Sequence, residues 1–281
     1  MDATYTSGTA VTLGARAGEP HREEVKMAKA SQPADARFAE QVRAAPFIFT
    51  GQIVKARASG IAALAPDERI AVVRVATVLR APPVLGALGG KLITIQLAEG
   101  RPMKVGAKAL FYAASWLYGE GIAVVEVARE SVPRDAKAML AAVAQAELRI
   151  EDGKLRARLE LAELVLTGMV VETDAVEPED VSPRSEHDPM WWRAEIAIDQ
   201  TEKGALDEAR HSAYFPSSLD VYWLEVPKLQ PGQRGTFILH RHAEGKKALM
   251  PPPGLALLHP LDFQLPAEVN RVRALLKLTP G

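Results

Sequence analysis

The sequence predicts a mainly β protein with flanking helices, built as two tandem small Greek-key barrels joined by a helical connector. Three observations predict this fold: an internal repeat of strand-like segments, turn glycines and prolines around each short strand, and a middle segment rich in helix-forming residues. Of the 281 residues, 48% are hydrophobic and 25% are charged, which is the composition of a globular chain.

The clearest repeat is the first strand of each half. Residues 44–56 (AAPFIFTGQIVKA) align without a gap with residues 161–173 (LAELVLTGMVVET), which places Gly51 on Gly168. Each segment is an apolar run with a central Thr-Gly, followed by alternating residues. This pattern predicts a buried strand with a bulge or a sharp bend at the glycine.

Further pairs of segments match in the same order along the chain. The alternating strand at 68–82 matches 191–204, the core strand at 104–113 matches 230–240, and the last strand and helix at 121–148 match 255–278. The offset between the copies grows from 117 to 123, 126 and 133 residues. Insertions in the loops of the second copy would produce this growth, so we interpret the chain as a duplication.

The repeats divide the chain into four parts. Residues 1–33 are a polar, aperiodic arm that we expect to be flexible, and Met27 is an alternative start that would make 1–26 an extension. Residues 34–132 form the first barrel with a leading helix. Residues 133–162 form a helical connector, which Gly153 could break in two, and 163–281 form the second barrel with a C-terminal helix.

The repeated strands resemble the netrin-like or TIMP-like module, an OB-type barrel whose sequences run G-x-V, then V-x-x-V-x-K-G, then G-x-x-Y-L-V-F. The matching residues in the first copy are Gly51, Val54, Val75, Val78, Arg80, Gly106, Leu110, Phe111 and Tyr112. Those in the second are Gly168, Val171, Ile198, Thr201, Lys203, Gly204, Gly232, Thr236, Phe237 and Ile238. The resemblance implies a binding or structural barrel. It does not imply metalloprotease inhibition, because the N-terminal cysteine and disulfides of those inhibitors have no counterpart here.

The chain has no cysteine, which excludes disulfides, thiolate metal sites and cysteine nucleophiles. It has no apolar stretch of the length that a spanning helix needs and no signal-like core at its N-terminus, so we expect a cytoplasmic protein without membrane contact. No motif predicts a catalytic site or a cofactor, and we expect a protein that is not an enzyme. The glycines at 85–91 lack the context of a phosphate loop and predict a hairpin loop.

Two pairs of adjacent aromatic residues stand out as interface candidates. Trp191 and Trp192 form one pair, and Tyr222 and Trp223 form the other. Neighbouring residues on a strand face opposite ways, so one member of each pair should be core and the other can be exposed. Inserted loops that bury both members are the alternative.

A histidine cluster and an acidic cluster are candidate metal sites. His240 and His242 share one strand face, with His211 or His259 as further imidazoles, but charged neighbours favour a strand end that emerges into solvent. Acidic residues crowd the loop after the first strand of the second copy, where prolines space them out. We therefore expect a solvated loop or a docking surface there, formed by Glu172, Asp174, Glu177, Glu179, Asp180, Glu186 and Asp188.

The charge of the two copies differs in sign. Residues 34–132 carry 12 basic and 8 acidic side chains, a net charge of +4, whereas residues 150–281 carry 15 basic and 21 acidic side chains, a net charge of −6. A charge of +4 is modest for a nucleic-acid binder, and the aromatic residues Phe47, Phe49, Phe111 and Tyr112 lie in apolar runs, so we do not expect nucleic-acid binding. The predicted contact faces are basic at Lys55, Arg57, Lys104 and Lys108, and acidic at Glu177, Glu179 and Asp180.

These observations predict a non-enzymatic structural or adaptor component of a larger intracellular assembly. Its partners would be other protein subunits, including further copies of the same chain in a head-to-tail contact. An inhibitor-like module that binds a ligand or a polypeptide is the alternative.

Overall fold

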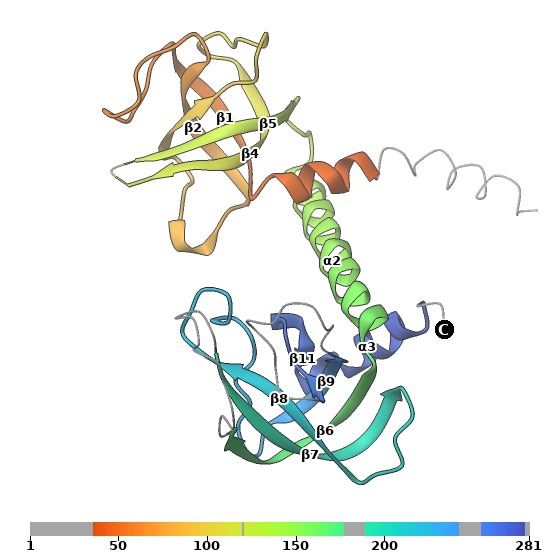
Figure 1. Ribbon diagram of the computed structural model, residues 1–281. Coiled ribbons are helices and arrows are strands. Elements are labelled where there is room, and N and C mark those ends of the chain that lie inside the picture. The colour runs from red at the N-terminus through yellow and green to blue at the C-terminus, as the bar shows by residue number, and fades with distance from the viewer. Residues whose placement is uncertain (1–35, 120, 177–188, 242–253, 279–281) are drawn as a thin grey trace, which may run out of the picture. The chain divides into compact units, whose positions relative to one another are not determined.

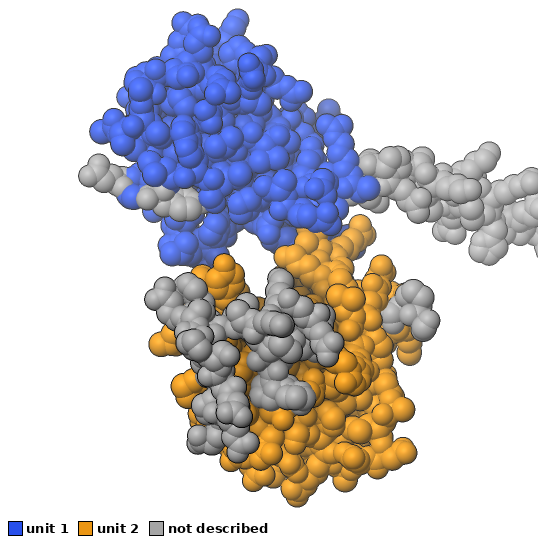
Figure 2. All heavy atoms as spheres, viewed as in Figure 1, with its two compact units in different colours: residues 1–147 blue, residues 148–281 orange. Residues whose placement is uncertain are grey.

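The computed structural model describes residues 36–119, 121–176, 189–241 and 254–278 (Figure 1). The chain divides into two compact units, residues 1–147 and residues 148–281 (Figure 2). Each unit contains a five-stranded barrel of the OB type, as the repeat predicts.

The first unit has a helix over residues 36–44 and a closed barrel with the strand order β1-β2-β3-β5-β4. Strands β3 and β5 run parallel, and the other neighbours are antiparallel. The elements are β1 (Phe47–Ala56), β2 (Ile70–Arg80), the 3-10 turn η1 (Pro83–Leu85), β3 (Leu92–Gln96), β4 (Lys108–Tyr118) and β5 (Ile122–Glu130).

The second unit repeats this strand order. Strand β10 pairs in parallel with β8 and antiparallel with β9, so β6-β7-β8-β10-β9 close a ring, and β11 is added beside β9. The elements are β6 (Leu164–Ala175), β7 (Met190–Lys203), β8 (Arg210–Ser217), β9 (Arg234–Arg241), β10 (Leu255–Ala256), η2 (Pro260–Asp262), β11 (Phe263–Gln264), η3 (Pro266–Glu268) and α3 (Val269–Leu276).

The two barrels also share their irregularities. The pairing of β1 with β2 shifts register at three places, and the pairing of β6 with β7 shifts at three places 117 residues later. One shift in each barrel comes immediately before Gly51 or Gly168, so the bulge predicted at these glycines is confirmed. A Cβ on Gly168 would lie 2.2 Å from the carbonyl oxygen of Ala197, and one on Gly51 would lie 2.5 Å from Val73 Cγ1. Only glycine fits where these strands approach so closely.

The connector is one helix, α2 (Ala136–Leu161). By the repeat offsets, the beginning of α2 corresponds to α3 of the second copy, and its end corresponds to the helix at residues 36–44 of the first copy. The closing helix of the first copy therefore continues directly into the leading helix of the second. Gly153 does not break it, because a single glycine costs only about 1 kcal/mol in a helix whose other residues are strong helix formers.

Four aromatic residues of the first copy are buried, as predicted. Phe47, Phe49, Phe111 and Tyr112 are each at most 1% exposed, and the rings of Phe49 and Phe111 stack with centroids 5.3 Å apart. In the second unit, Phe237 packs at 5.2 Å against Phe263, which joins the barrel core from β11.

The prediction of one continuous strand at residues 255–264 is wrong. Residues 255–264 form two short strands with η2 between them. Pro260 has no amide hydrogen for a strand ladder, and two side chains take the local amides instead. The Asp262 carboxylate accepts from the Leu258 amide at 2.7 Å, and the His259 ring accepts from the Leu261 amide at 3.1 Å.

Candidate functional site

The segment after β8 forms a hydrogen-bonded turn, which we call the Trp turn (residues 218–228). The Asp220 carboxylate accepts from the Tyr222 amide at 2.9 Å, and its backbone carbonyl accepts from the amides of Trp223 and Leu224. At the other end, the ammonium group of Lys228 donates to the carbonyl oxygens of Trp223 and Val226. Burial lowers the pKa of Lys228. Both ends of this turn are therefore capped, which fixes its conformation.

The Trp turn is anchored by one indole. Trp223 is 9% exposed and packs edge-on against Trp191, which is 7% exposed, with ring centroids 5.8 Å apart. Its neighbour Tyr222 is 74% exposed. Tyr222 and Trp223 thus divide into one exposed and one core residue, as predicted, but they lie in a turn and not in the strand on which that prediction rested.

Around this anchor, the turn presents apolar side chains to solvent. Leu219 is 89% exposed, Val221 is 80% exposed and Leu224 is 56% exposed. Together with Tyr222 they place four exposed apolar side chains within six residues of a hydrogen-bonded turn. Such a concentration is typical of a binding surface.

The other tryptophan pair is placed differently. Trp191 lies in the small core with Trp223, whereas Trp192 is half-buried and packs against Phe215 at 6.4 Å. The indole Nε1 of Trp192 is buried without a hydrogen-bond partner among the described residues. Trp192 therefore contributes to the barrel interior rather than to an exposed surface.

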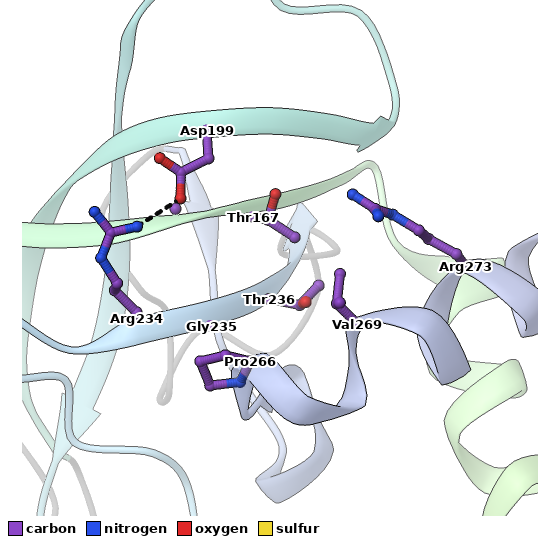
Figure 3. Close-up of a pocket in the computed structure, with 9 residues that line it drawn as sticks. Thr167, Asp199, Arg234, Gly235, Thr236, Pro266, Val269 and Arg273 are labelled. Carbon is purple, nitrogen blue, oxygen red and sulfur yellow. Dashed lines mark hydrogen bonds and ion pairs between the residues drawn. The ribbon is translucent and has the colours of Figure 1, made fainter.

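A hollow of about 240 Å³ lies on the second barrel beside its C-terminal helical segment. Figure 3 shows the side chains that surround it, which come from strands β6, β7 and β9 on one side and from η3 and α3 on the other. They are Thr167, Gly168, Asp199, Arg234, Gly235, Thr236, Pro266, Val269 and Arg273.

Two ion pairs border this hollow. Arg234 donates to Asp199 at 2.9 Å, and Arg273 donates to Glu202 at 2.6 Å and to Gln200 at 2.7 Å. Hydrogen bonding to Glu202 raises the pKa of Arg273. The charges of the border thus cancel in pairs, which suits a neutral polar ligand better than an ion.

The floor of the hollow contains a hydroxyl group without a partner. Thr236 is fully buried, and its Oγ1 has no hydrogen-bond partner among the described residues. A buried hydroxyl that lacks a hydrogen bond is costly, but this oxygen is closed to solvent, so a ligand in the hollow reaches it only when neighbouring side chains move.

The first barrel keeps only part of this polar lining. Thr236 pairs with Thr167 across β9 and β6, and the equivalent pair in the first barrel is Leu110 with Thr50. The repeat offset places Leu140 at the position of Arg273. The sequence carries a usable signal for this hollow that the predictions above do not include, which is a threonine at the position of Leu110 in an otherwise apolar motif.

A buried ionic network ties the C-terminal segment to α2. Asp262 is fully buried and accepts two hydrogen bonds at 2.8 Å from the Arg158 guanidinium. The Nε2 atom of His240 lies 3.1 Å from the same carboxylate. Burial acts to raise the pKa of Asp262, but hydrogen bonds from His240 and Arg158 lower it below its ordinary value. The oxygens of this carboxylate have four hydrogen-bond contacts in all, so we interpret Asp262 as a structural residue rather than a reactive one.

The expectation that the strand emerges into solvent at His240 is wrong, because this side chain is 5% exposed and lies against Asp262. His242 lies outside the described residues. Within residues 36–119, 121–176, 189–241 and 254–278, no group of three potential ligands could hold a metal ion.

The predicted contact faces are only partly described. Lys55, Lys104 and Lys108 are exposed on the first barrel, and Arg57 is exposed and paired with Glu68 at 3.2 Å. Glu177, Glu179 and Asp180 lie outside the described residues, as do Glu186 and Asp188. The interface assignments of both faces stay predictions.

In the described part of the chain, no helix is both long and apolar enough to cross a membrane. Comparison with known proteins finds no family model and no curated protein that matches the chain.

Proposed function

We propose that this chain is a non-enzymatic adaptor of an intracellular assembly, and that the Trp turn of its second barrel binds another polypeptide. The observation that carries the proposal is the exposure of Leu219, Val221, Tyr222 and Leu224 on a turn whose conformation is already fixed. The resemblance to netrin-like modules, which implies a binding or structural barrel, agrees with this role.

Two contributions to the free energy favour binding through the Trp turn. Burying large apolar side chains against a partner contributes about 25 cal/mol per Å² of apolar area. Because Asp220 and Lys228 already hold the turn, little backbone entropy is lost when a partner binds. Tyr222 would be the central contact, since tyrosine is enriched among the residues that dominate binding energy.

A photo-crosslinking amino acid placed at position 222 tests the proposal in the native cells. We expect a cross-link to one partner protein, and none from the same group placed at Val84, which is 87% exposed on the first unit. With the purified partner, Leu224→Ser should weaken binding at least about tenfold, and Val84→Ser should leave it unchanged. Equal cross-linking at both positions would refute a specific role of the turn.

A second function, binding of a small polar ligand, is favoured by the unpartnered hydroxyl of Thr236 in the hollow. The test is ligand-observed NMR of the full chain with a set of small neutral polyols and amides. We expect binding that Thr236→Leu abolishes, because this variant introduces the residue of the first barrel. A ligand that binds the variant equally well would contradict this function.

A further inference from the structure

One row of residues crosses four strands of the first barrel on its outer surface. Lys108 on β4 pairs with Gln52 on β1, Gln52 pairs with Arg74 on β2, and Arg74 pairs with Leu92 on β3. Lys108 and Arg74 are exposed, and Leu92 is 51% exposed. We call this set the basic row (Lys108, Gln52, Arg74 and Leu92).

The two cations of the basic row have no partner. Among the described residues, neither Arg74 nor Lys108 makes an ion pair or a side-chain hydrogen bond. Glu130 on β5 pairs with Leu110 on β4, not with Lys108, so it lies outside the basic row. The exposed Lys104 adds positive charge on the loop before β4.

The duplicated barrel provides an internal comparison. Its equivalent row, read through the same strand pairings, is Arg234, Met169, Ala197 and Arg210. Here both cations are neutralised from within the chain. Arg234 pairs with Asp199 at 2.9 Å, and Arg210 pairs with Glu195 at 3.5 Å.

The acids that neutralise the second row come from β7, and β2 has no counterpart for them. The repeat offset places Ala76 at the position of Asp199 and Val72 at that of Glu195. The first barrel thus keeps one cation of the second row, Lys108 at the position of Arg234, and lacks its carboxylate. Its other cation, Arg74, stands at the position of Ala197 and has no carboxylate beside it either. An acidic partner would supply the missing carboxylates.

We propose that the basic row binds the acidic stretch of a second copy of this chain, residues 172–188. The stretch contains seven acidic residues and one arginine. Its described part ends β6, where the exposed Asp174 pairs with Arg193 at 3.3 Å. Opposite net charges on the two copies of the repeat, +4 and −6, favour the same contact.

The row itself favours a polypeptide over a nucleic acid. The Gln52 side-chain nitrogen donates to the Gly106 carbonyl at 3.1 Å, its side-chain oxygen can accept a hydrogen bond from a peptide amide, and Leu92 offers an apolar contact. Single-stranded nucleic acids are bound on aromatic side chains that stack with bases, and none of the four residues of the row is aromatic.

The contact joins different surfaces of two identical molecules, so it either closes into a ring or continues as a filament. It extends the proposed adaptor role to a surface on the other unit. The variants below leave the Trp turn unchanged, so that either proposal can fail alone.

The experiment measures self-association of the full chain by sedimentation velocity at about 50 mM and about 500 mM salt. We expect association that weakens about tenfold or more at the higher salt, because exposed charges are screened within about 4–14 Å over this range. One variant carries Arg74→Glu and Lys108→Glu, and the other carries Glu177→Lys, Glu179→Lys and Asp180→Lys. Each alone should be monomeric, since like charges then face each other.

Mixing the two variants is the decisive step. The mixture restores opposite charges in both possible contacts, so association should return. The matched control is Lys137→Glu with Lys277→Glu, which changes the net charge equally at exposed positions outside the row. It should associate like the unaltered chain.

Three outcomes would overturn the proposal. They are a monomer at all salt concentrations, association that ignores both sets of charge reversals, and a mixture that stays monomeric. A labelled single-stranded oligonucleotide serves as the competing probe. If it binds the full chain, loses binding in the Arg74→Glu/Lys108→Glu variant, and no self-association is seen, the partner of the row is a nucleic acid instead.

Discussion

Arg80 and Lys203 are equivalent residues that cap equivalent helices. Arg80 ends β2 and donates to the carbonyl oxygens of Val42 and Ala45, at the end of the helix over residues 36–44. Lys203 ends β7 and donates to those of Leu159 and Glu160, at the end of α2, at 2.8 and 2.9 Å. In each barrel a cation at the end of the second strand thus satisfies carbonyls that the helix leaves unpaired, and interacts favourably with the negative end of the helix dipole.

Replacing Lys203 by methionine should lower the free energy of unfolding by about 1–2 kcal/mol, because two charged hydrogen bonds and a favourable dipole contact are lost while the aliphatic stem is kept. Urea unfolding followed by circular dichroism measures this change. The control is Lys91→Met, whose exposed lysine has no partner among the described residues. Equal effects of both variants would contradict the capping role.

Replacing Gly168 by alanine should destabilise the second unit by about 1–3 kcal/mol, because the new Cβ would lie 2.2 Å from a backbone oxygen of β7 that cannot move without disrupting the sheet. Gly153→Ala is the matched control. Its Cβ would meet nothing within 4 Å, and the change should stabilise α2 by up to about 1 kcal/mol. Thermal unfolding of the two variants should therefore shift in opposite directions. A stabilising Gly168→Ala would contradict the close approach at the bulge.

Replacing Asp262 by asparagine should cost about 3–5 kcal/mol, because the guanidinium of Arg158 then loses its buried counter-charge. The pKa of Asp262 is lowered in the folded state, so its contribution to stability is present above its ordinary value of 3.8 and is lost as the pH falls toward the folded pKa. Urea unfolding from pH 7 to pH 3 should show a smaller loss of stability in the variant than in the unaltered chain. The exposed pair of Asp174 and Arg193 provides the control, since Asp174→Asn should change stability by less than about 1 kcal/mol.

Replacing Trp223 by alanine should cost about 3 kcal/mol, because it removes the indole that packs on Trp191 and leaves a cavity beneath the turn. Leu219→Ala, at a side chain that is 89% exposed, should change stability by less than about 0.5 kcal/mol. Calorimetry of both variants distinguishes the anchor from the exposed residues. A neutral Trp223→Ala would show that the turn is held without it.

Replacing Thr236 by valine should leave the stability unchanged or raise it by up to about 1 kcal/mol, because the buried hydroxyl has no partner to lose. Thr94 is the matched control in the first barrel. It is equally buried, but its Oγ1 accepts from the Gly60 amide at 3.0 Å, so Thr94→Val should cost about 1 kcal/mol or more. Urea unfolding compares the two variants. A large loss at Thr236 would mean that its hydroxyl is satisfied in the native protein.

The sequence alone determined the duplicated barrel. The run around Thr-Gly in β1 and β6, with period-two alternation in the next strand, is a local pattern, and local patterns report the backbone conformation and the buried face directly. For the same reason the bulges at Gly51 and Gly168 and the helical connector could be predicted. Tyr222 and Trp223 do divide into an exposed and a buried residue, but in a turn, where the strand alternation used to predict the division does not apply.

Contacts between distant residues were decided only by the tertiary structure. Arg158 and Asp262 are 104 residues apart, and no local pattern predicts that this arginine neutralises that carboxylate. In the same way, Arg74 and Arg234 are both exposed cations in alternating strands. One has a carboxylate beside it and the other has none, because cross-strand register and side-chain reach, rather than sequence distance, set which charges meet.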